Sequence, residues 1–249
     1  YITPDLEGFK VEIAYTLAGL VVGFVVGLTG IGGGALMTPI LILGFGVAPI
    51  VAVSTDLLYA AITKCGGVFG YARKQLVHYR VVVLLLAGSL PASLLTLELL
   101  ASFGAQALIE QVINLTLGFS LVLTSIAVFM RQRVKLLAEG MRETEIGQRL
   151  KKLRPLLTLL AGLVLGVLVT LSSVGAGALG TAVLILLYPR LSMAQIVGTD
   201  LLHAVLLTAV AGLGHYQMGS VDTSLLLNLL MGSLPGVFVG SYLGARLSH

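Results

Sequence analysis

The sequence predicts an all-α polytopic membrane protein built from two related halves. Of its 249 residues, 57% are hydrophobic and only 10% are charged, whereas an average soluble chain carries about 25% charged residues. Its apolar runs reach the roughly 20 residues that a helix needs to cross a bilayer. No stretch alternates with the period of two that a membrane β-barrel requires. These observations exclude a soluble globular domain.

The first half contains five apolar segments separated by short breaks. We expect helices at about 11–28, 35–45, 49–71, 81–97 and 107–130. A glycine run separates the first two, and Pro49 opens the third because proline is tolerated in the first turn of a helix. Pro91 is expected to kink the fourth, since proline removes an intrahelical hydrogen bond.

A basic segment, residues 131–154, divides the chain and holds eight of its fifteen Lys and Arg residues. We expect an extramembrane connector, either a solvated charged linker or an amphipathic helix lying on anionic headgroups. The predicted organisation is a first transmembrane repeat at 1–130, a cytoplasmic connector at 131–154 and a second transmembrane repeat at 155–249.

The second half repeats the first. Four segments recur in the same order: 19–23 at 162–166, 27–34 at 170–177, 55–58 at 199–202 and 88–91 at 232–235. The offset is 143 residues for the first two matches and 144 for the others. Ordered matches with a single-residue slip indicate an internal duplication. A partner of the helix at 107–130 would begin near residue 251, so we expect a final helix to be missing from the chain.

The distribution of charge predicts how the two repeats are oriented. If the connector is cytoplasmic, thirteen of the fifteen basic residues lie on that side, the exceptions being Lys10 and Lys64. The loop at 73–80 carries three Lys or Arg residues, whereas its counterpart at 215–222 carries none. Equivalent loops are therefore expected on opposite sides of the membrane. This is the inverted-topology duplication found in many secondary transporters.

The run Gly-Leu-Thr-Gly-Ile-Gly-Gly-Gly at 27–34 is the clearest candidate for a binding element. Glycines turn sharply and leave backbone N–H groups bare, and such groups at a helix start can hold an anion. Irregular backbone survives in a membrane only inside protein or along a wet cavity. A tight helix–helix contact of small residues is the alternative. The near-copy at 170–177 favours the anion site.

The segments flanking each glycine run are short. They could be two spans each, or a broken or re-entrant hairpin that reaches the midplane. We interpret them as discontinuous hairpins whose tips approach each other near the bilayer centre.

Ionisable residues inside membrane helices are functional candidates by default because they are costly to bury. Four such residues occur here: Asp56, Lys64, Asp200 and His203. We expect Lys64 to supply the charge that holds an anion. Asp56, Asp200 and His203 are expected to couple transport to an ion or proton, since histidine titrates near neutral pH. Alternatively, the aspartates cap or tie down helix ends, with Lys64 as a salt-bridge partner.

The predicted anion site joins Lys64 to hydroxyls and to the two glycine runs. Its candidate substrate-binding residues are Gly30, Gly32, Gly33, Gly34, Thr55, Lys64, Ser173, Gly175, Gly177 and Thr199. The duplication maps Tyr59 onto His203 and Lys64 onto Thr208, so a pseudo-symmetric cavity would have an asymmetric lining. His215 is expected at the membrane interface.

Other chemistry finds little support in the sequence. The single cysteine, Cys65, lies in an apolar run, which excludes an internal disulfide and suggests no thiol chemistry. No catalytic residue, metal ligand or cofactor is expected. The net charge of +4 follows the positive-inside rule, so it does not indicate nucleic-acid binding.

Several linked motifs resemble the TauE/SafE family of bacterial permeases. They are Gly-x-Gly-Gly-Gly at 30–34 with Pro39, Thr-Asp-Leu-Leu in both halves, Ile62-Thr-Lys64, Gly-His-Tyr-x-x-Gly at 214–219 and the basic loop at 73–80. The likeness runs from Gly19 to Arg246. Many members have Thr-Ser where this chain has Thr55-Asp56 and Thr199-Asp200, so the chain resembles the branch with acidic residues there.

The resemblance implies a multi-pass permease of the bacterial inner membrane that exports sulfite or organosulfonates. We therefore expect a non-enzymatic transporter that moves a small sulfur-containing anion by alternating access between inverted repeats. Its expected partners are that anion and the lipid bilayer, and no nucleic acid. A coupling proton and a homo-oligomer are left open.

Three alternative functions use the same residues. An anion channel on the same plan is the nearest. An intramembrane hydrolase would pair Ser172 or Ser173 with His203, but no nucleophile motif surrounds them. A retinal protein would use Lys64 for a Schiff base with Asp56 as counter-ion, and the absence of any Trp and the duplicated plan speak against it.

Overall fold

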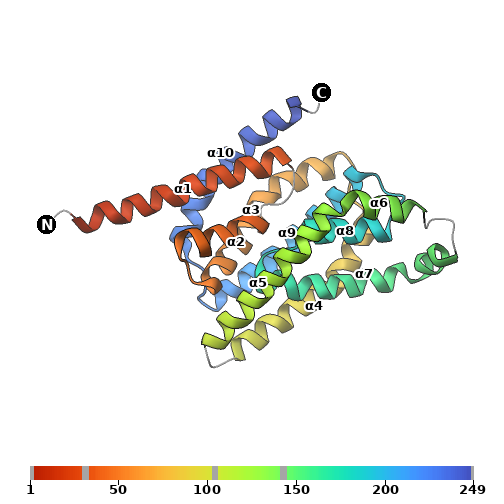
Figure 1. Ribbon diagram of the computed structural model, residues 1–249, viewed down its shortest axis with the longest axis horizontal. Helices are drawn as coiled ribbons and strands as arrows, with labels where there is room; N and C mark the ends of the chain where they lie inside the picture. Colours follow the sequence, from red (N-terminus) through yellow and green to blue (C-terminus); the bar gives the residue numbers. More distant parts are fainter. Residues whose placement is uncertain (1–2, 30–33, 103–105, 141–144, 248–249) are drawn as a thin grey trace.

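The structure, a computed structural model, describes residues 3–29, 34–102, 106–140 and 145–247, and every regular element in them is helical (Figure 1). The elements are α1 (Thr3–Thr29), α2 (Gly34–Pro39), the π-helical η1 (Ile40–Gly44), α3 (Pro49–Arg73), α4 (Tyr79–Ser102), α5 (Gln106–Phe129), α6 (Arg131–Gly140), α7 (Glu145–Ser172), α8 (Ala178–Leu187), α9 (Met193–Gln217) and α10 (Thr223–Leu247). The predicted all-α class is confirmed.

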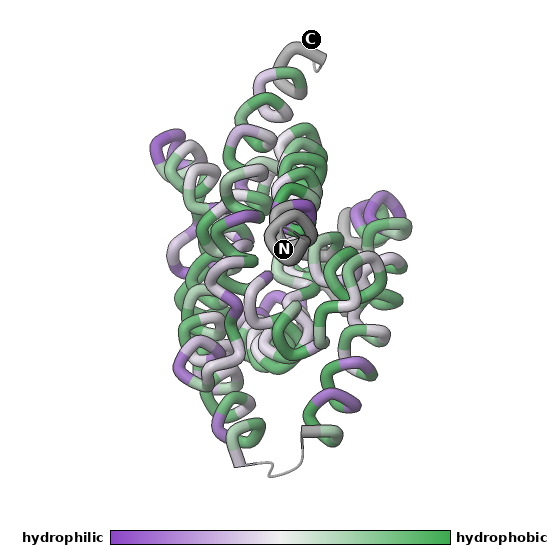
Figure 2. The backbone as a smooth tube through the Cα atoms, turned by 90° about the vertical axis from the view of Figure 1, so that its left-hand side faces the viewer, coloured by the Kyte–Doolittle hydropathy of each residue, from purple (hydrophilic) through white to green (hydrophobic). Residues whose placement is uncertain are grey.

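Six helices in the described part of the chain are long and apolar enough to cross a membrane, namely α1, α4, α5, α7, α9 and α10. Helix α3 is as long as α9, at 25 residues, but it falls outside this set. It carries the charged residues Asp56 and Lys64. Hydrophobic residues predominate along most of the long helices (Figure 2). A polytopic membrane protein follows from these helices.

The short elements after the glycine runs are too short to cross a bilayer. Helix α8 has 10 residues, so at 1.5 Å per residue it extends about 15 Å, half of the roughly 30 Å hydrocarbon core. Helix α2 has six residues and η1 has five. These lengths agree with broken helix pairs that end within the membrane, and not with separate spans.

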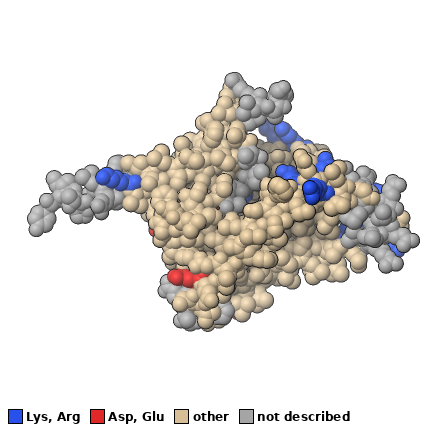
Figure 3. All heavy atoms as spheres, in the orientation of Figure 1, with Lys and Arg blue, Asp and Glu red and all other residues tan. Residues whose placement is uncertain are grey.

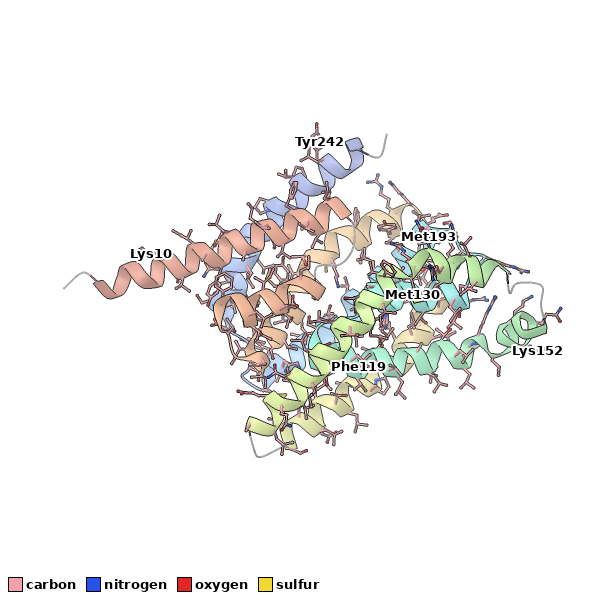
Figure 4. All side chains as sticks on the ribbon, viewed as in Figure 1. Lys10, Phe119, Met130, Lys152, Met193 and Tyr242 are labelled. Atoms are coloured by element: carbon pink, nitrogen blue, oxygen red, sulfur yellow. The ribbon has the colours of Figure 1, made fainter. Side chains whose placement is uncertain are left out.

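The predicted connector is partly helical. Its first part forms α6, and α7 already begins at Glu145, ten residues before the predicted start of the second repeat. On the face shown in Figure 3, most Lys and Arg side chains gather at the end of the molecule that holds α6 and the start of α7. Figure 4 shows Lys152 of α7 at this end and Lys10 of α1 at the opposite end. The described basic residues on this face thus concentrate at one end of the molecule, and the side of the membrane that this end occupies stays a prediction.

Glycines let the long helices pack backbone against backbone. A Cβ on Gly19 would collide with the backbone of Leu229, and a Cβ on Gly162 would collide with that of Leu85. These contacts join α1 to α10 and α7 to α4, which lie side by side along their lengths. Lipid offers no hydrophobic drive for helix association, so small residues that permit close approach carry the packing.

The two central helices, α3 and α9, are equivalent in the duplication and run antiparallel. Leu58 of α3 lies against Gly212 of α9, whereas Gly67, further along α3, lies against Leu201, nearer the start of α9. The helices α1 and α10, and likewise α4 and α7, pack as exchanged pairs. Antiparallel packing of equivalent helices agrees with an inverted duplication, and the orientation of the repeats in the bilayer stays a prediction.

Candidate functional site

The break between α7 and α8, residues 173–177, is a buried turn. Three of its residues have positive φ: Ser173 at 58°, Gly175 at 107° and Gly177 at 135°. Such angles suit glycine because it lacks a Cβ. The Ser172 hydroxyl donates to the carbonyl of Leu168 at 2.6 Å and accepts from the N–H of Val174 at 3.2 Å. The irregular backbone is enclosed by protein, as a membrane setting demands.

Lys64 of α3 reaches this break from the other repeat. Its Nζ donates a hydrogen bond of 2.9 Å to the carbonyl oxygen of Ala176, and only 5% of its side chain is exposed. A buried ammonium is costly unless it is paired and hydrogen-bonded. The structure therefore brings together Lys64 and the second glycine run, two elements that the sequence predicted to share a site.

Each of the two candidate aspartates is held by a threonine of its own repeat. The Thr38 hydroxyl donates to Oδ2 of Asp56 at 2.5 Å, and the Thr181 hydroxyl donates to Oδ2 of Asp200 at 2.8 Å. The two Oδ1 atoms are buried and have no hydrogen-bond partner in the described part of the chain. Both carboxylates interact electrostatically with Lys64. The aspartates thus tie helices together, as one alternative expected; Asp200 keeps one free oxygen, whereas the Ser173 hydroxyl lies beside the carboxylate of Asp56.

His203 is the third candidate for ion coupling, and it is also buried. Its Nε2 lies 3.0 Å from the hydroxyl of Ser89, while its Nδ1 has no hydrogen-bond partner among the described residues. Lys64 acts on the ring electrostatically. The serine beside this histidine is therefore Ser89 of α4, not Ser172 or Ser173 as the hydrolase alternative required. Ser173 instead lies beside Asp56.

The two candidate threonines, Thr55 and Thr199, are occupied by backbone groups. Thr55 Oγ1 accepts from the N–H of Asp222 at 3.2 Å, and Thr199 Oγ1 accepts from the N–H of His78 at 3.0 Å. These equivalent bonds anchor the loop after α9 to α3 and the loop after α3 to α9. Their part in binding an anion stays a prediction. Of the first glycine run, Gly30, Gly32 and Gly33 lie outside the described residues, and Gly34 begins α2.

His215 is a residue whose environment the sequence did not reveal. We expected it at the membrane interface, but its side chain is fully buried. Its Nε2 lies 3.0 Å from the carbonyl oxygen of Thr170, on α7 shortly before the break. From sequence alone, a histidine near the end of a membrane helix is expected at the interface. In the structure, the packing of α9 against α7 encloses His215.

A cavity of about 150 Å³ opens beside the second break. It is lined by residues of α3, α5, α6, α8 and α9 and by the break itself: Lys64, Tyr71, Ala127, Val128, Arg131, Ala176, Gly177, Ala178, Thr181, Ala182, Val197, Asp200, Leu201 and Ala204. One ordered water needs about 10–15 Å³ of such space, and drug-sized ligands need about 300–1,000 Å³. The cavity therefore suits a small polar solute.

Two other hollows are larger but carry no charge. They measure about 460 and 410 Å³, and apolar side chains of α4, α5, α7 and α8 line them almost entirely. Such surfaces suit lipid acyl chains. Of these three hollows, only the smaller cavity is lined by charged side chains, and there Arg131 joins two predicted site residues, Lys64 and Asp200. The sequence did not single out Arg131 among the eight basic residues of the connector.

Known proteins resemble this chain along most of its length. The family described as "Sulfite exporter TauE/SafE" matches residues 15–249. A relative from Bacillus subtilis (strain 168), described as "Probable membrane transporter protein YjnA", is 40% identical over 243 residues, which cover 95% of this chain and 92% of the relative. No solved structure matches the chain.

Proposed function

The chain belongs to the sulfite exporter TauE/SafE family, and from that premise we propose that it exports a small sulfur oxyanion by alternating access between its two repeats. The family and the B. subtilis relative are membrane transporters, a non-enzymatic class. The proposed substrate is sulfite or an organosulfonate, and the proposed location is the inner membrane of a bacterium.

The observation that carries the proposal is the position of Lys64. Its ammonium is buried at the wall of a small cavity, on the backbone of a broken helix that belongs to the other repeat. An ammonium has three N–H donors, and the carbonyl of Ala176 takes one of them. The others are available to an anion in the cavity, where low dielectric strengthens a charge-assisted hydrogen bond.

The start of α8 adds a second attraction for an anion. The first N–H groups of a helix have no partner within the helix, and the helix dipole makes this end weakly positive. Gly177 and Ala178, where α8 starts, both line the cavity. We place the sulfur oxyanion between Lys64 and these N–H groups, with Ser173 and Gly175 shaping the turn and Gly30 to Gly34 as the equivalent element of the first repeat. In this proposal Thr55 and Thr199 hold the loops around the site.

The Oδ1 atoms of the two aspartates and the Nδ1 atom of His203 supply candidate coupling positions. Each is buried and without a hydrogen-bond partner in the described residues, and Lys64 interacts electrostatically with all three side chains. We propose that Asp56, Asp200 and His203 take up or release a coupling ion or proton as the anion binds. A charge that moves between them would change the field that the anion experiences.

Flux of ³⁵S-labelled sulfite into proteoliposomes tests the proposal. Lys64→Ala should lower the initial rate by about 10- to 100-fold, because it removes a charge-assisted hydrogen bond to the anion, which is worth about 1.5–3 kcal/mol. Lys74→Ala is the matched control, since Lys74 is exposed on the loop after α3 and does not line the cavity. Lys64→Gln and a thermal-unfolding curve show whether a loss of flux reflects loss of folding.

Two results would contradict this function. Wild-type flux of sulfite and methanesulfonate no greater than that of empty liposomes would remove the substrate class. Single-channel currents across a planar bilayer would replace the alternating-access transporter by an anion channel of the same architecture.

A further inference from the structure

Arg131 occupies a special position among the basic residues of the connector. It is the first residue of α6 and follows the turn at Met130 that ends α5 (Figure 4). Arg131 is partly buried and lines the cavity, whereas the next two residues, Gln132 and Arg133, are exposed. One arginine of the connector therefore faces the proposed binding site.

Packing of α6 on α8 fixes this orientation. Lys135 lies one helical turn after Arg131, on the same face of α6. It lines a different hollow, with Ser192, Met193 and Ile196 around the start of α9. The basic face of α6 thus lies along the protein, and Arg131 is the member of that face that reaches the cavity wall shared with Lys64.

The charges of the cavity favour an anion at this wall. Its lining contains two cations, Lys64 and Arg131, and one carboxylate, Asp200. The Asp200 side chain takes its hydrogen bond from Thr181, and no ion pair joins it to Arg131 within the part of the chain that the structure describes. Arg131 acts on Asp200 only at longer electrostatic range. The guanidinium of Arg131 therefore forms no bidentate ion pair with the Asp200 carboxylate.

We propose that Arg131 is a specificity-determining residue at the connector-side mouth of the cavity, where its guanidinium binds two oxygens of a sulfite or sulfonate group before the anion passes to Lys64. This inference rests on the proposed function. A guanidinium presents a planar fork of N–H donors that matches two oxygens of an oxyanion, whereas an ammonium acts as a point charge. The fork favours oxyanions over halides, which offer a single spherical acceptor.

Saturation curves for ³⁵S-sulfite in proteoliposomes test the role of Arg131. Arg131→Gln should raise KM by roughly tenfold, since it removes a hydrogen bond to a charged group, and should leave the maximal rate within about twofold because binding is lost uniformly. Arg133→Gln, which removes the same charge from an exposed position of the same helix, should follow the wild-type curve. An unchanged KM in Arg131→Gln would overturn the inference.

Arg131→Lys separates fork recognition from simple charge. It should lose discrimination, so that chloride competes with sulfite at a concentration several-fold lower than in the wild type. Equal inhibition by chloride in Arg131→Lys and wild type would reduce Arg131 to a point charge and overturn the specificity role.

Two further measurements address other roles for the same cation. If Arg131 only balances Asp200, Asp200→Asn in the Arg131→Gln background should restore the wild-type KM, and that result would overturn the inference. If it anchors lipid headgroups, the KM difference should disappear in vesicles of phosphatidylcholine alone, which would also overturn it. Persistence of the difference in both conditions supports capture of the anion.

Failure of this inference is distinguishable from failure of the proposed function. A wild-type protein that moves neither sulfite nor methanesulfonate contradicts the function itself. Wild-type flux with the same KM in Arg131→Gln and Arg133→Gln contradicts only the role of Arg131.

Discussion

The two repeats contain equivalent contacts, although their sequences have diverged widely. The Thr38–Asp56 hydrogen bond has its counterpart in Thr181–Asp200. The bonds that anchor the loops to α3 and α9 are likewise duplicated, as are the close glycine contacts of the long helices. Contacts in which one backbone touches another tolerate little change, because even a methyl group would not fit.

The residues that face the centre differ between the repeats. Lys64 reaches the break of the other repeat, whereas its equivalent, Thr208, bonds the carbonyl of Ala204 in its own helix at 2.8 Å. Tyr59 in one repeat corresponds to His203 in the other. After the duplication, the contacts of the scaffold were therefore preserved, whereas the residues that face the centre changed. As a result, a pseudo-symmetric arrangement of helices has its polar site on one side only.

The largest expected effect tests the claim that the scaffold is equivalent in both repeats. A Cβ on Gly88 would collide with the carbonyl of Leu159, and a Cβ on Gly232 with that of Thr16. Gly88→Val and Gly232→Val should each abolish the yield of monodisperse protein in size-exclusion chromatography, because the clashing atoms belong to backbone and cannot move aside.

Gly118→Val on α5 provides the matched control for these two substitutions. A Cβ there would meet no atom within 4 Å, so this variant should purify like the wild type. A folded Gly232→Val beside a misfolded Gly88→Val would show that the two helix pairs are not equivalent.

The next effect concerns the two threonine–aspartate bonds. Thr38→Val and Thr181→Val each remove a donor from a buried carboxylate, so each should lower the free energy of unfolding by about 1.5–3 kcal/mol. Thermal unfolding in a constant detergent measures the loss. Thr63→Val serves as the control, since the Thr63 hydroxyl bonds the Tyr59 carbonyl of its own helix and should matter little. Losses that differ by more than about 1 kcal/mol between the two variants would break the equivalence.

Much of the fold could be predicted because membrane helices leave strong local signals. Hydropathy marked most of the long helices, and the second glycine run marked the break between α7 and α8. The repeated Thr-Asp-Leu-Leu segments placed Asp56 and Asp200 in equivalent positions. Lys64 was found for a physical reason: a lysine in an apolar run must find a partner, and a partner on another helix implies a polar interior.

The partners of these residues could not be predicted, because they depend on how helices pack. Thr38 and Thr181 are ordinary threonines on short helices, and only tertiary contact brings them to the aspartates. Arg131 was one of eight basic residues in a segment that the sequence described only by composition. His215 lies near a helix end, and its enclosure depends on the approach of α7.

The smallest expected effect compares Tyr59 with His203, the equivalent pair that diverged. The Tyr59 hydroxyl is buried beside the Ser233 hydroxyl, and neither makes a short hydrogen bond with the described residues, so Tyr59→Phe removes an unsatisfied polar group and should leave the free energy of unfolding unchanged or raise it by up to about 1 kcal/mol. His203→Phe removes the bond to Ser89 and leaves a buried hydroxyl unsatisfied, which should cost about 1–3 kcal/mol. Thermal unfolding of both variants beside the wild type measures the difference. Equal changes in the free energy of unfolding would mean that the bond between His203 and Ser89 does not stabilise the fold. The two repeats would then differ in the chemistry of their lining residues but not in the stability that these residues provide.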